Sequence, residues 1–397
     1  MKFKRKIYSK LLDWKNNDSD RYALLIEGAR RIGKSTIVEE FAKHEYKSYI
    51  LIDFSDNQED VISLFNEMTD LDFLFLRLQS IYHVNLIEKE SLIIFDEVQF
   101  CPKARQAIKA LVKDGRYNYI ETGSLISIEQ NVKDILIPSE DMVINMYPMD
   151  FLEFLEAIGQ SSTIQLLKYY LSNNKSMTDN ENRELLKKFR LYMLVGGMPQ
   201  AVSTYIENNS FAEVEKVKRV ILRLYHQDFY KLDDSGRLSK LFDTIPSALE
   251  HNKNRYNISS VLNQRITDST SERLLSQLID SKTVIPSYHV ANPGPSLAQT
   301  KELDKFKLFI ADTGLFCTLM FYDRYENEEP YNDLYQKLFS DKLSANLGYL
   351  YENAVAQQIS SNGYNVYYHT FPNATSHRNY EIDFIYIKVP LPHYQSS

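Results

Sequence analysis

The residues with the clearest chemical pattern are Gly28 to Ser35, which read Gly-Ala-Arg-Arg-Ile-Gly-Lys-Ser. They follow the spacing of a phosphate-binding loop: a glycine, four residues of any type, then Gly-Lys and a serine or threonine. An apolar run of strand type, 23–26, precedes the loop, and a segment with helical spacing, 36–43, follows it. Backbone N–H groups and the positive end of a helix dipole would then converge, and both favour an anion there.

The loop residues have separable roles in holding a nucleotide. Gly28 and Gly33 permit backbone conformations and a close approach that a Cβ would hinder. We expect Lys34 to reach the β- and γ-phosphates of ATP and the Ser35 hydroxyl to hold Mg²⁺. The predicted binding residues are the loop and the residue after it: Gly28, Ala29, Arg30, Arg31, Ile32, Gly33, Lys34, Ser35 and Thr36.

A strand that ends in two carboxylates supplies the other half of the predicted site. Residues 91–96 read Ser-Leu-Ile-Ile-Phe-Asp, and Glu97 follows them. Asp96 is predicted to bind Mg²⁺ directly or through water. Glu97 is predicted to orient and deprotonate the attacking water. The alternative is a pair of solvated turn carboxylates, and the presence of the phosphate-binding loop favours the catalytic assignment.

Another polar strand end follows residues 117–122, where the chain reads Thr122-Gly123-Ser124. Ser124, or else Thr122, could hydrogen-bond the attacking water and so sense the γ-phosphate; an ordinary turn is the alternative. Asp53, at the end of the predicted strand 48–54, is expected to be structural rather than catalytic. The predicted catalytic residues are therefore Lys34, Glu97 and Ser124.

A sheet is needed to bring these motifs together. Five apolar segments of strand length alternate with helical segments in residues 1–150: 23–26, 48–54, 91–96, 117–122 and 142–146. Such alternation predicts a parallel α/β sheet with right-handed crossovers, in which ligands bind at the carboxyl ends of the strands. Asp96 and Ser124 should then lie on either side of the nucleotide. The predicted fold class is α/β, with a P-loop NTPase core.

Helical patterns replace strands from residue 151 to residue 235. Within this stretch, residues 196–199 read Gly-Gly-Met-Pro. This turn either joins two helices or brings backbone against the nucleotide, and the sequence leaves both roles open. Three arginines are candidates for an arginine finger, although surface arginines are common: Arg190, Arg219 and Arg223.

Residues 236–325 have the pattern of a winged-helix-like unit, with three helices followed by two strands. Its third helix, 270–280, would face a DNA major groove. A slight local excess of Lys and Arg over Asp and Glu agrees with that role. Winged helices also serve as protein-contact modules or lids, so a protein partner is the alternative. Residues 326–333 look like an acidic linker, and a helix and two strands are predicted between 346 and 387.

Length, composition and charge limit the number of domains and the classes of function that the chain can have. A length of 397 residues allows two to four domains, and 44% hydrophobic with 25% charged residues is ordinary for globular proteins. The formal charge of −7 excludes a polybasic nucleic-acid binder, so any nucleic-acid contact would be local. The two cysteines, Cys101 and Cys317, are too few for a disulfide framework or a zinc site. Because neither a membrane-length apolar run nor a signal-peptide pattern is present, we expect a cytoplasmic protein without membrane association.

Taken together, the motifs resemble those of a family of bacterial and archaeal P-loop ATPases of the AAA+ superclass with a C-terminal domain of unknown function. The resemblance rests on motifs along nearly the whole chain: Gly28–Ser35, Phe-Asp-Glu-Val-Gln (95–99) with Cys101-Pro102, Asp-Gly-Arg-Tyr (114–117), Thr-Gly-Ser-Leu (122–125), Tyr-Pro-Met-Asp-Phe-Leu-Glu-Phe-Leu (147–155), Gly-Gly-Met-Pro (196–199), Asp-Thr-Gly-Leu (312–315), Tyr-Glu-Asn-Ala-Val (351–355) and Glu-Ile-Asp-Phe (381–384). It implies an ATPase core at 1–150, a helical lid at 151–235, a winged-helix-like domain at 236–325, and a C-terminal α/β region at 326–397 similar to restriction-endonuclease-like nucleases.

The C-terminal region departs from the nuclease pattern that the resemblance implies. Glu352 and Asp383 match the first acid and the central acid of that pattern. Such nucleases also need a further strand with Glu-x-Lys, where this chain has Tyr386-Ile-Lys388. Tyrosine thus stands in place of the acid, and the nuclease-like region is expected to be truncated. We therefore expect no nuclease activity.

The sequence leaves three functions open. The first is a nucleotide-driven switch or motor, in which ATP hydrolysis moves the lid, the winged helix and the C-terminal module. The second is an ATP-regulated DNA-binding or regulatory protein with little turnover, and the third is an ATP-gated nuclease. The intact Asp96–Glu97 pair favours turnover. The expected partners are ATP with Mg²⁺, double-stranded DNA or a partner protein at the winged-helix and C-terminal region, and other copies of the chain in a homo-oligomer.

Overall fold

The chain divides into two units in the computed structural model, Met1–Tyr147 and Pro148–Ser397. Among the residues that the structure describes, no helix is both long enough and apolar enough to cross a membrane. The described residues are 2–56, 59–66, 70–123, 139–251, 255–263, 266–294, 296–321, 347–372 and 379–387.

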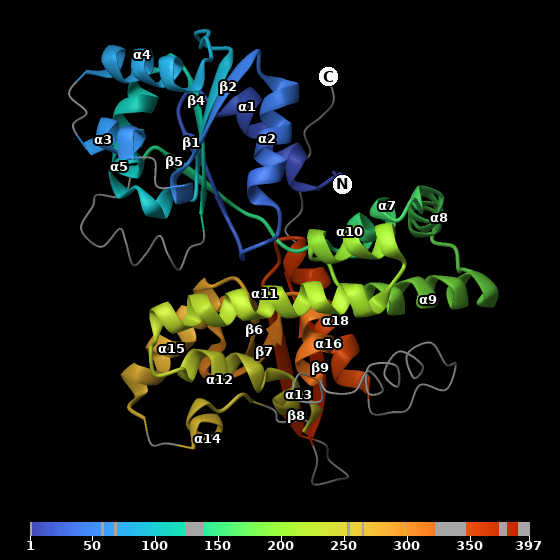
Figure 1. Cartoon of the computed structure of the whole chain (residues 1–397). Helices are drawn as coiled ribbons and strands as arrows, with labels where there is room; N and C mark the ends of the chain where they lie inside the picture. Colours follow the sequence, from blue (N-terminus) through green and yellow to red (C-terminus); the bar gives the residue numbers. More distant parts are fainter. Residues whose placement is uncertain are drawn as a thin grey trace. The chain divides into compact units, whose positions relative to one another are not determined.

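A five-stranded sheet lies at the centre of the first unit, and all of its strand pairs are parallel (Figure 1). Its strand order is β2-β3-β4-β1-β5, so β4 lies between the strand before the loop and the strand that carries Asp96. This arrangement confirms the predicted α/β fold class. The strands are β1 (Ala23–Glu27), β2 (Ser48–Asp53), β3 (Ser91–Asp96), β4 (Asn118–Gly123) and β5 (Asp141–Asn145).

Helices cover both faces of this sheet, with α3, α4 and α5 on one side and α1 and α2 on the other (Figure 1). Consecutive strand residues are therefore buried on opposite faces, as β1 and β3 show along their whole length. Such strands read as continuous apolar runs, which is why they could be predicted. The elements that connect or flank them are α1 (Ile7–Asn17), α2 (Lys34–Glu45), η1 (Phe54–Asp56), α3 (Glu59–Asn66), α4 (Leu71–Tyr82), η2 (Val98–Phe100) and α5 (Pro102–Asp114).

The second unit begins with helices, several of which start at recognisable caps. Asp150 with Glu153, and Thr178 with Glu181, form capping boxes at α7 and α9. Pro199 occupies the first turn of α10, where its missing N–H costs nothing. The helices of this unit are α7 (Phe151–Ala157), α8 (Ser161–Ser172), α9 (Asp179–Val195), α10 (Pro199–Asn208), α11 (Phe211–Leu232), α12 (Arg237–Asp243), α13 (Ile245–Glu250), α14 (Ile258–Leu262), α15 (Asp268–Asp280), α16 (Thr313–Met320) and α18 (Gly348–Ser361).

A mixed four-stranded sheet completes the second unit, in the order β7-β6-β8-β9. The pair β6–β7 is antiparallel, β6–β8 is parallel and β8–β9 is antiparallel. One sheet thus contains strands from the expected winged-helix-like stretch and from the expected C-terminal region. The strands are β6 (Val284–Val290), β7 (Lys301–Ile310), β8 (Val366–Pro372) and β9 (Asn379–Ile385), and a short η3 (Leu297–Gln299) precedes β7.

Candidate nucleotide site

The loop from Gly28 to Ser35 leaves β1 and enters α2 with a glycine at each of its two critical bends. Gly33 is the residue before α2, and its φ of 93° is a left-handed conformation that favours glycine. A Cβ on Gly28 would collide with the Met146 carbonyl oxygen and with the Ile32 side chain. The loop therefore closes against the end of β5, where the Met146 N–H donates to the Glu27 carbonyl at 2.7 Å.

Lys34 lies inside the curve of this loop. Only 6% of its surface is exposed, and its Nζ donates to the carbonyl oxygens of Gly28 and Ala29, each at 3.0 Å. A buried ammonium needs such partners because its desolvation is costly. The loop thus places a positive charge at its centre. A phosphate oxygen, which carries a full charge, would be a stronger acceptor for this amine than a carbonyl.

Arg5, from the basic N-terminal stretch, supports the loop from outside. Its Nη1 donates to the Ile32 carbonyl at 2.9 Å, and its Nη2 donates to the Tyr147 carbonyl at 2.6 Å. Arg5 is thus a structural partner of the loop, although it lies among basic residues of the kind that usually face solvent. Nothing in the local pattern distinguishes Arg5 from its basic neighbours, because its partners lie far along the chain.

Three side chains from three different elements meet where magnesium is expected. Ser35 Oγ donates to Asp96 Oδ1 at 2.8 Å, and Thr122 Oγ1 donates to the same oxygen. Asp96 and Thr122 are buried at the ends of β3 and β4, whereas Ser35 is half-buried in the first turn of α2. Serine hydroxyl and carboxylate oxygens are hard ligands of the kind that Mg²⁺ prefers. These residues therefore fit the ion that the loop implies.

Glu97 lies next to this group, in a left-handed conformation with a φ of 52°. Its backbone N–H donates to Thr122 Oγ1 at 3.4 Å, and its Oε2 accepts from Gln99 Nε2. The side chain is half-buried, so it keeps access to water. Gln99, two positions after Glu97, orients the Glu97 carboxylate through this hydrogen bond. No role for Gln99 was predicted from the sequence.

The other predicted residues of the loop region differ in exposure. Arg31 and Thr36 are exposed and Arg30 is half-buried, while Ala29 and Ile32 are buried. Ser124 lies outside the described residues, so Thr122 is the residue of this strand end that the structure brings to Asp96. Asp53 accepts hydrogen bonds from the Ser55 N–H at 2.8 Å and from the Ser55 hydroxyl at 2.6 Å, which agrees with a structural role.

A buried ionic cluster lies within the same unit. Arg105 on α5 pairs through Nη1 with Glu121 Oε2 at 2.6 Å and through Nη2 with Asp141 Oδ2 at 2.8 Å. One guanidinium thus serves two carboxylates. Burial raises the pKa of Glu121 to about 8, because the attraction of Arg105 only partly offsets the cost of desolvating the charge. Burial also raises the pKa of Asp141.

The turn Gly196–Pro199 belongs to a buried polar cluster of the second unit. The Gly197 N–H donates to Asp312 Oδ2 at 2.6 Å, and its carbonyl accepts from the Met149 N–H at 2.7 Å. A Cβ on Gly196 would lie 2.5 Å from Asp312 Oδ1. Gln357 Oε1 accepts from the Thr313 N–H at 2.8 Å, beside Asp312. Both backbone groups of Gly197 are thus used within the unit, which favours the connecting role of this turn.

The three candidate arginines have different environments. Arg190 is buried and donates from Nε to the Tyr351 hydroxyl at 3.2 Å. Arg219 donates from Nε to Glu215 Oε1 at 3.0 Å. Arg223 is exposed on α11. Of the three, Arg223 has the exposure that an arginine finger needs, and its role stays a prediction.

The C-terminal acids lie beside a lysine that was not predicted to have a role. Lys307 Nζ on β7 donates to Glu381 Oε1 and lies 3.9 Å from Glu352 Oε2. Burial raises the pKa of Glu352, nearby Asp383 and Glu381 add to this rise, and the charge of Lys307 opposes it. Among the described residues, no group of three or more His, Cys, Asp or Glu side chains is arranged to hold a metal ion. Lys388 lies outside the described residues.

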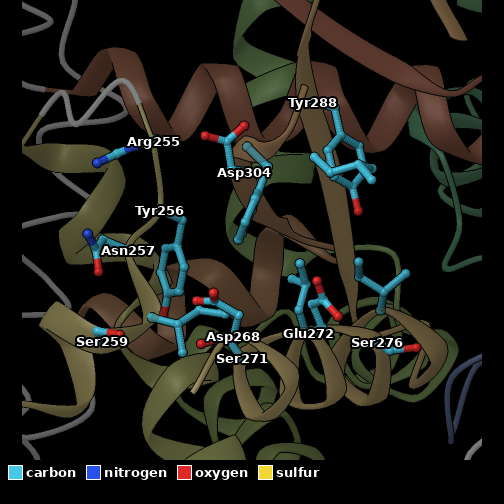
Figure 2. A pocket seen from close by; sticks show the side chains of 15 residues that line it. Arg255, Tyr256, Asn257, Ser259, Asp268, Ser271, Glu272, Ser276, Tyr288 and Asp304 are labelled. Carbon is cyan, nitrogen blue, oxygen red and sulfur yellow. The ribbon is translucent and has the colours of Figure 1, made fainter. Parts of the chain in front are cut away.

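The helix that was expected to face DNA, α15, borders a cavity whose walls also include residues of β6 and β7 (Figure 2). Asp268 and Glu272 lie on the cavity side of α15, and Asp304 lies across from them. Carboxylates repel phosphate groups, so this side of the helix is poorly suited to a nucleic-acid backbone.

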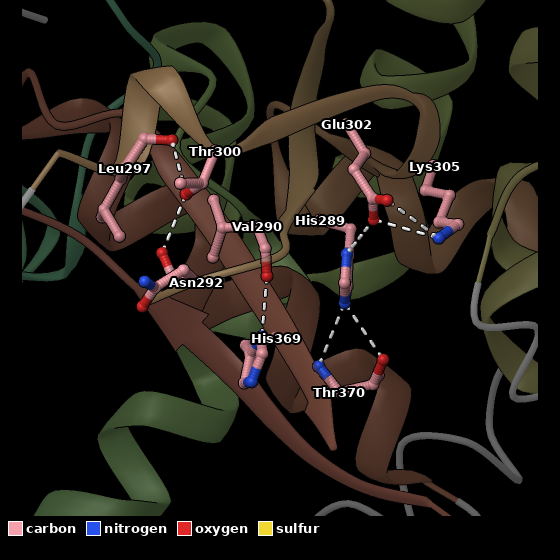
Figure 3. Close-up of polar contacts among 9 residues, drawn as sticks. All are labelled: His289, Val290, Asn292, Leu297, Thr300, Glu302, Lys305, His369 and Thr370. Atoms are coloured by element: carbon pink, nitrogen blue, oxygen red, sulfur yellow. Dashed lines mark hydrogen bonds and ion pairs between the residues drawn. The ribbon is translucent and has the colours of Figure 1, made fainter. Parts of the chain in front are cut away.

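A polar network crosses the second sheet around His289 (Figure 3). His289 Nδ1 lies 2.5 Å from Glu302 Oε2, and Nε2 lies 3.0 Å from Thr370 Oγ1. The Thr370 N–H also donates to Nε2 at 3.2 Å, which assigns the imidazole proton to Nδ1. Carboxylate, imidazole and hydroxyl are arranged in the order of a hydrolytic triad. The lone pair of His289 Nε2, however, already accepts a hydrogen bond from the Thr370 backbone N–H. The network joins β7, β6 and β8.

Comparison with known families supports this reading of the first unit. A model described as an AAA domain matches residues 20–155, and a model described as a domain of unknown function (DUF8612) matches residues 186–326. The first unit contains an AAA-type P-loop ATPase domain. The resemblance to AAA+ proteins with a domain of unknown function is confirmed at this level. Neither model reaches the stretch after residue 326, where a nuclease-like region was expected.

Solved structures of other proteins also show similarity to the chain. The Walker-type ATPase PABY2304 of Pyrococcus abyssi is 17% identical, with 80% of this chain and 96% of that chain covered and a TM-score of 0.48. A single-residue variant of RuvB from Thermotoga maritima is 12% identical, with 71% and 89% covered and a TM-score of 0.33. At such low identities and TM-scores these similarities do not bear on function. A search among curated proteins found no match.

Proposed function

We propose that the chain binds ATP with Mg²⁺ at the loop Gly28–Ser35 and hydrolyses it. The observation that supports this most directly is the hydrogen bond between Ser35 Oγ and Asp96 Oδ1, at 2.8 Å. It joins the phosphate-binding loop to the carboxylate strand, so both halves of a nucleotide site meet at one point. A loop that only bound an anion would have no need of this carboxylate.

Each residue of the site has a role that its contacts support. Lys34 would exchange its two carbonyl partners for phosphate oxygens, and the N–H groups at the start of α2 would bind the remaining phosphate charge. Ser35 and Asp96 would hold Mg²⁺, which would neutralise charge on the phosphates. Thr122 orients Asp96, because its hydroxyl donates to the carboxylate.

Glu97 is the proposed general base. Its carboxylate is half-buried, and Gln99 and the backbone bond to Thr122 fix its position. It would accept a proton from water as the water oxygen bonds to the γ-phosphorus and the bond from that phosphorus to the ADP oxygen breaks. Ser124 remains a proposed contact of the attacking water.

We also propose that nucleotide state is passed to the second unit. Arg5 binds the Ile32 carbonyl within the loop and the carbonyl of Tyr147, the last residue of the first unit. A change in loop shape on nucleotide binding would therefore act on the connection to Pro148. The lid at 151–235, the winged-helix-like region at 236–325 and the C-terminal region are the proposed moving parts. Duplex DNA or a partner protein would then respond to the nucleotide.

Phosphate release from ATP by the purified chain, with Mg²⁺ and with EDTA, tests this proposal. We expect turnover that needs Mg²⁺ and is lost in Lys34→Ala. Arg5→Gln should leave ATP binding measurable while weakening any effect of ATP on protease sensitivity of the second unit. Wild-type turnover in Lys34→Ala would contradict the assigned site. The same assay with and without duplex DNA separates a DNA-stimulated ATPase from one that responds to another partner.

A further inference from the structure

A cavity of about 540 Å³ lies in the second unit between α15, strands β6 and β7, and the start of α14 with the segment before it (Figure 2). Its volume falls in the range of about 300–1,000 Å³ that is common for ligand pockets. It is built entirely from residues of the second unit. The cavity therefore shares no lining residue with the proposed nucleotide site.

Aromatic rings form part of its wall. The Tyr256 and Tyr288 rings lie 6.4 Å and 6.0 Å from the Phe306 ring, between centroids. Tyr256 is held in place, because its hydroxyl donates to the Leu241 carbonyl at 2.6 Å. Tyr288 already carries a cation on one face, with Lys301 Nζ at 3.7 Å from its ring centroid. The hydrogen bond thus fixes the Tyr256 ring, and aromatic rings of this kind attract cations.

Carboxylates occupy two opposite sides of the same cavity (Figure 2). Asp268 and Glu272 are one turn apart on α15, and Asp304 on β7 lies across from them. All three are exposed, and none forms an ion pair or accepts a side-chain hydrogen bond among the residues that the structure describes. Arg255 is the one basic side chain among the lining residues. With Lys301 against the Tyr288 ring, three carboxylates face two cations, so the described surroundings of the cavity are net negative.

We propose that this cavity binds an arginine side chain presented by a basic segment of a partner protein. A guanidinium is planar, so it can lie against an aromatic ring while it donates to carboxylates on either side. The cavity is larger than one side chain, which leaves room for neighbouring residues of the segment. The face of α15 that was expected to meet DNA is thus a protein-contact face, because its carboxylates would repel phosphates.

Binding of labelled peptides to the full chain tests this proposal. The probe is a short peptide of alternating arginine and glycine, and its matched control has glutamine in place of arginine. At about 0.1 M salt, we expect the arginine peptide alone to bind. A variant that combines Asp268→Asn, Glu272→Gln and Asp304→Asn should weaken binding about tenfold, since three partly exposed ion pairs are lost.

A second variant controls for net charge. Glu207→Gln, Asp234→Asn and Glu250→Gln together remove the same charge from exposed positions outside the cavity, and should change affinity less than about twofold. Tyr288→Ala should weaken binding and Tyr288→Phe should preserve it, with thermal unfolding as the check that each variant folds. Equal losses in both triple variants, or no binding by the wild-type chain, would overturn the proposal. The proposal would also be overturned if arginine amide bound as tightly as the peptide. Duplex DNA that binds the wild-type chain but not Tyr288→Ala would overturn it as well.

Discussion

Ser35 and Asp96 are separated by 61 positions in the chain, yet the hydroxyl of one donates to the carboxylate of the other at 2.8 Å. The parallel sheet causes this contact, because the loop after β1 and the end of β3 lie at the same edge. Thr122, at the end of the intervening strand β4, donates to the same oxygen. The oxygen ligands expected for Mg²⁺ are thus held together by the protein itself, and this arrangement leads to the first predictions.

Replacement of the loop lysine should weaken ATP binding and leave the fold intact. Lys34→Ala removes the ammonium that lies among the loop carbonyls, and no other lysine lies in the loop. We expect ATP affinity to fall about 10- to 100-fold, the usual cost of a lost charged hydrogen bond. Fluorescent ATP-analogue binding measures this. Lys43→Ala, an exposed helix lysine paired with Glu39, is the matched control and should bind like the wild type.

Replacement of the proposed base should affect turnover and leave binding intact. Glu97→Gln keeps the shape of the side chain and its contact with Gln99, but an amide cannot accept the proton from water. We expect phosphate release to fall about 10²- to 10⁴-fold with ATP affinity nearly unchanged. If Glu97→Gln kept most of its turnover while Asp96→Asn lost it, the base would have to be sought elsewhere.

Thr122 offers a test of the arrangement around Asp96. Thr122→Val has nearly the same shape but removes the hydroxyl that donates to Asp96 and accepts from the Glu97 N–H. We expect turnover to fall about tenfold and the Mg²⁺ requirement to rise, because the carboxylate loses its orientation. Thr122→Ser keeps the hydroxyl and should restore both. A Mg²⁺ titration that is identical in the valine and wild-type proteins would show that this hydroxyl has no such role.

The first unit could be predicted closely because its signals are local. Strands buried on both faces read as apolar runs, and the loop from Gly28 to Ser35 is contiguous. What the sequence did not show is which strands are neighbours: β4 lies between β1 and β3, so Thr122 reaches Asp96. The contact of Arg5 with Ile32 and Tyr147 was missed for the same reason, since its partners are distant in the chain.

The second unit was predicted less completely because its organisation depends on long-range pairing. The parallel pair β6–β8 joins segments separated by a long stretch of chain, and no local pattern indicates it. Thr244 separates α12 from α13, which has Pro246 in its first turn, so four described helices precede β6 where three were expected. Helix α16 was not predicted either. The sequence did not decide the role of the turn at Gly196. Its proximity to Asp312 depends on the three-dimensional fold and could not be predicted from the local pattern.

The buried cluster around Glu121 predicts how stability depends on pH. Its pKa is raised from 4.5 to about 8 in the folded state, so the folded protein keeps a proton that the unfolded chain releases at lower pH. The free energy of unfolding should therefore fall as pH rises from about 5 to about 8, by up to about 1.4 kcal/mol per pH unit from this group. The raised pKa of Asp141 acts in the same direction.

Urea unfolding at several pH values checks this prediction. A signal that comes from the first unit should be used to monitor the unfolding. Glu121→Gln cannot ionise, so its stability should fall less steeply over the same range than that of the wild type. Glu59→Gln, at an exposed position of α3 in the same unit, is the control and should keep the wild-type slope. A Glu121→Gln protein with an unchanged slope would mean that Glu121 is ionised throughout this range.

The C-terminal acids lead to the last prediction, which is that the chain does not cleave DNA in a metal-dependent reaction. Lys307 donates to Glu381 and lies 3.9 Å from Glu352 Oε2, so an ammonium already neutralises part of the charge that would attract a divalent ion. Tyr386 stands where the nuclease pattern requires a further acid, and phosphodiester cleavage needs that acid to complete the metal site. Plasmid and linear DNA should stay intact with Mg²⁺ or Mn²⁺. Cleavage that disappears in Asp383→Ala would prove a working nuclease site and contradict this argument.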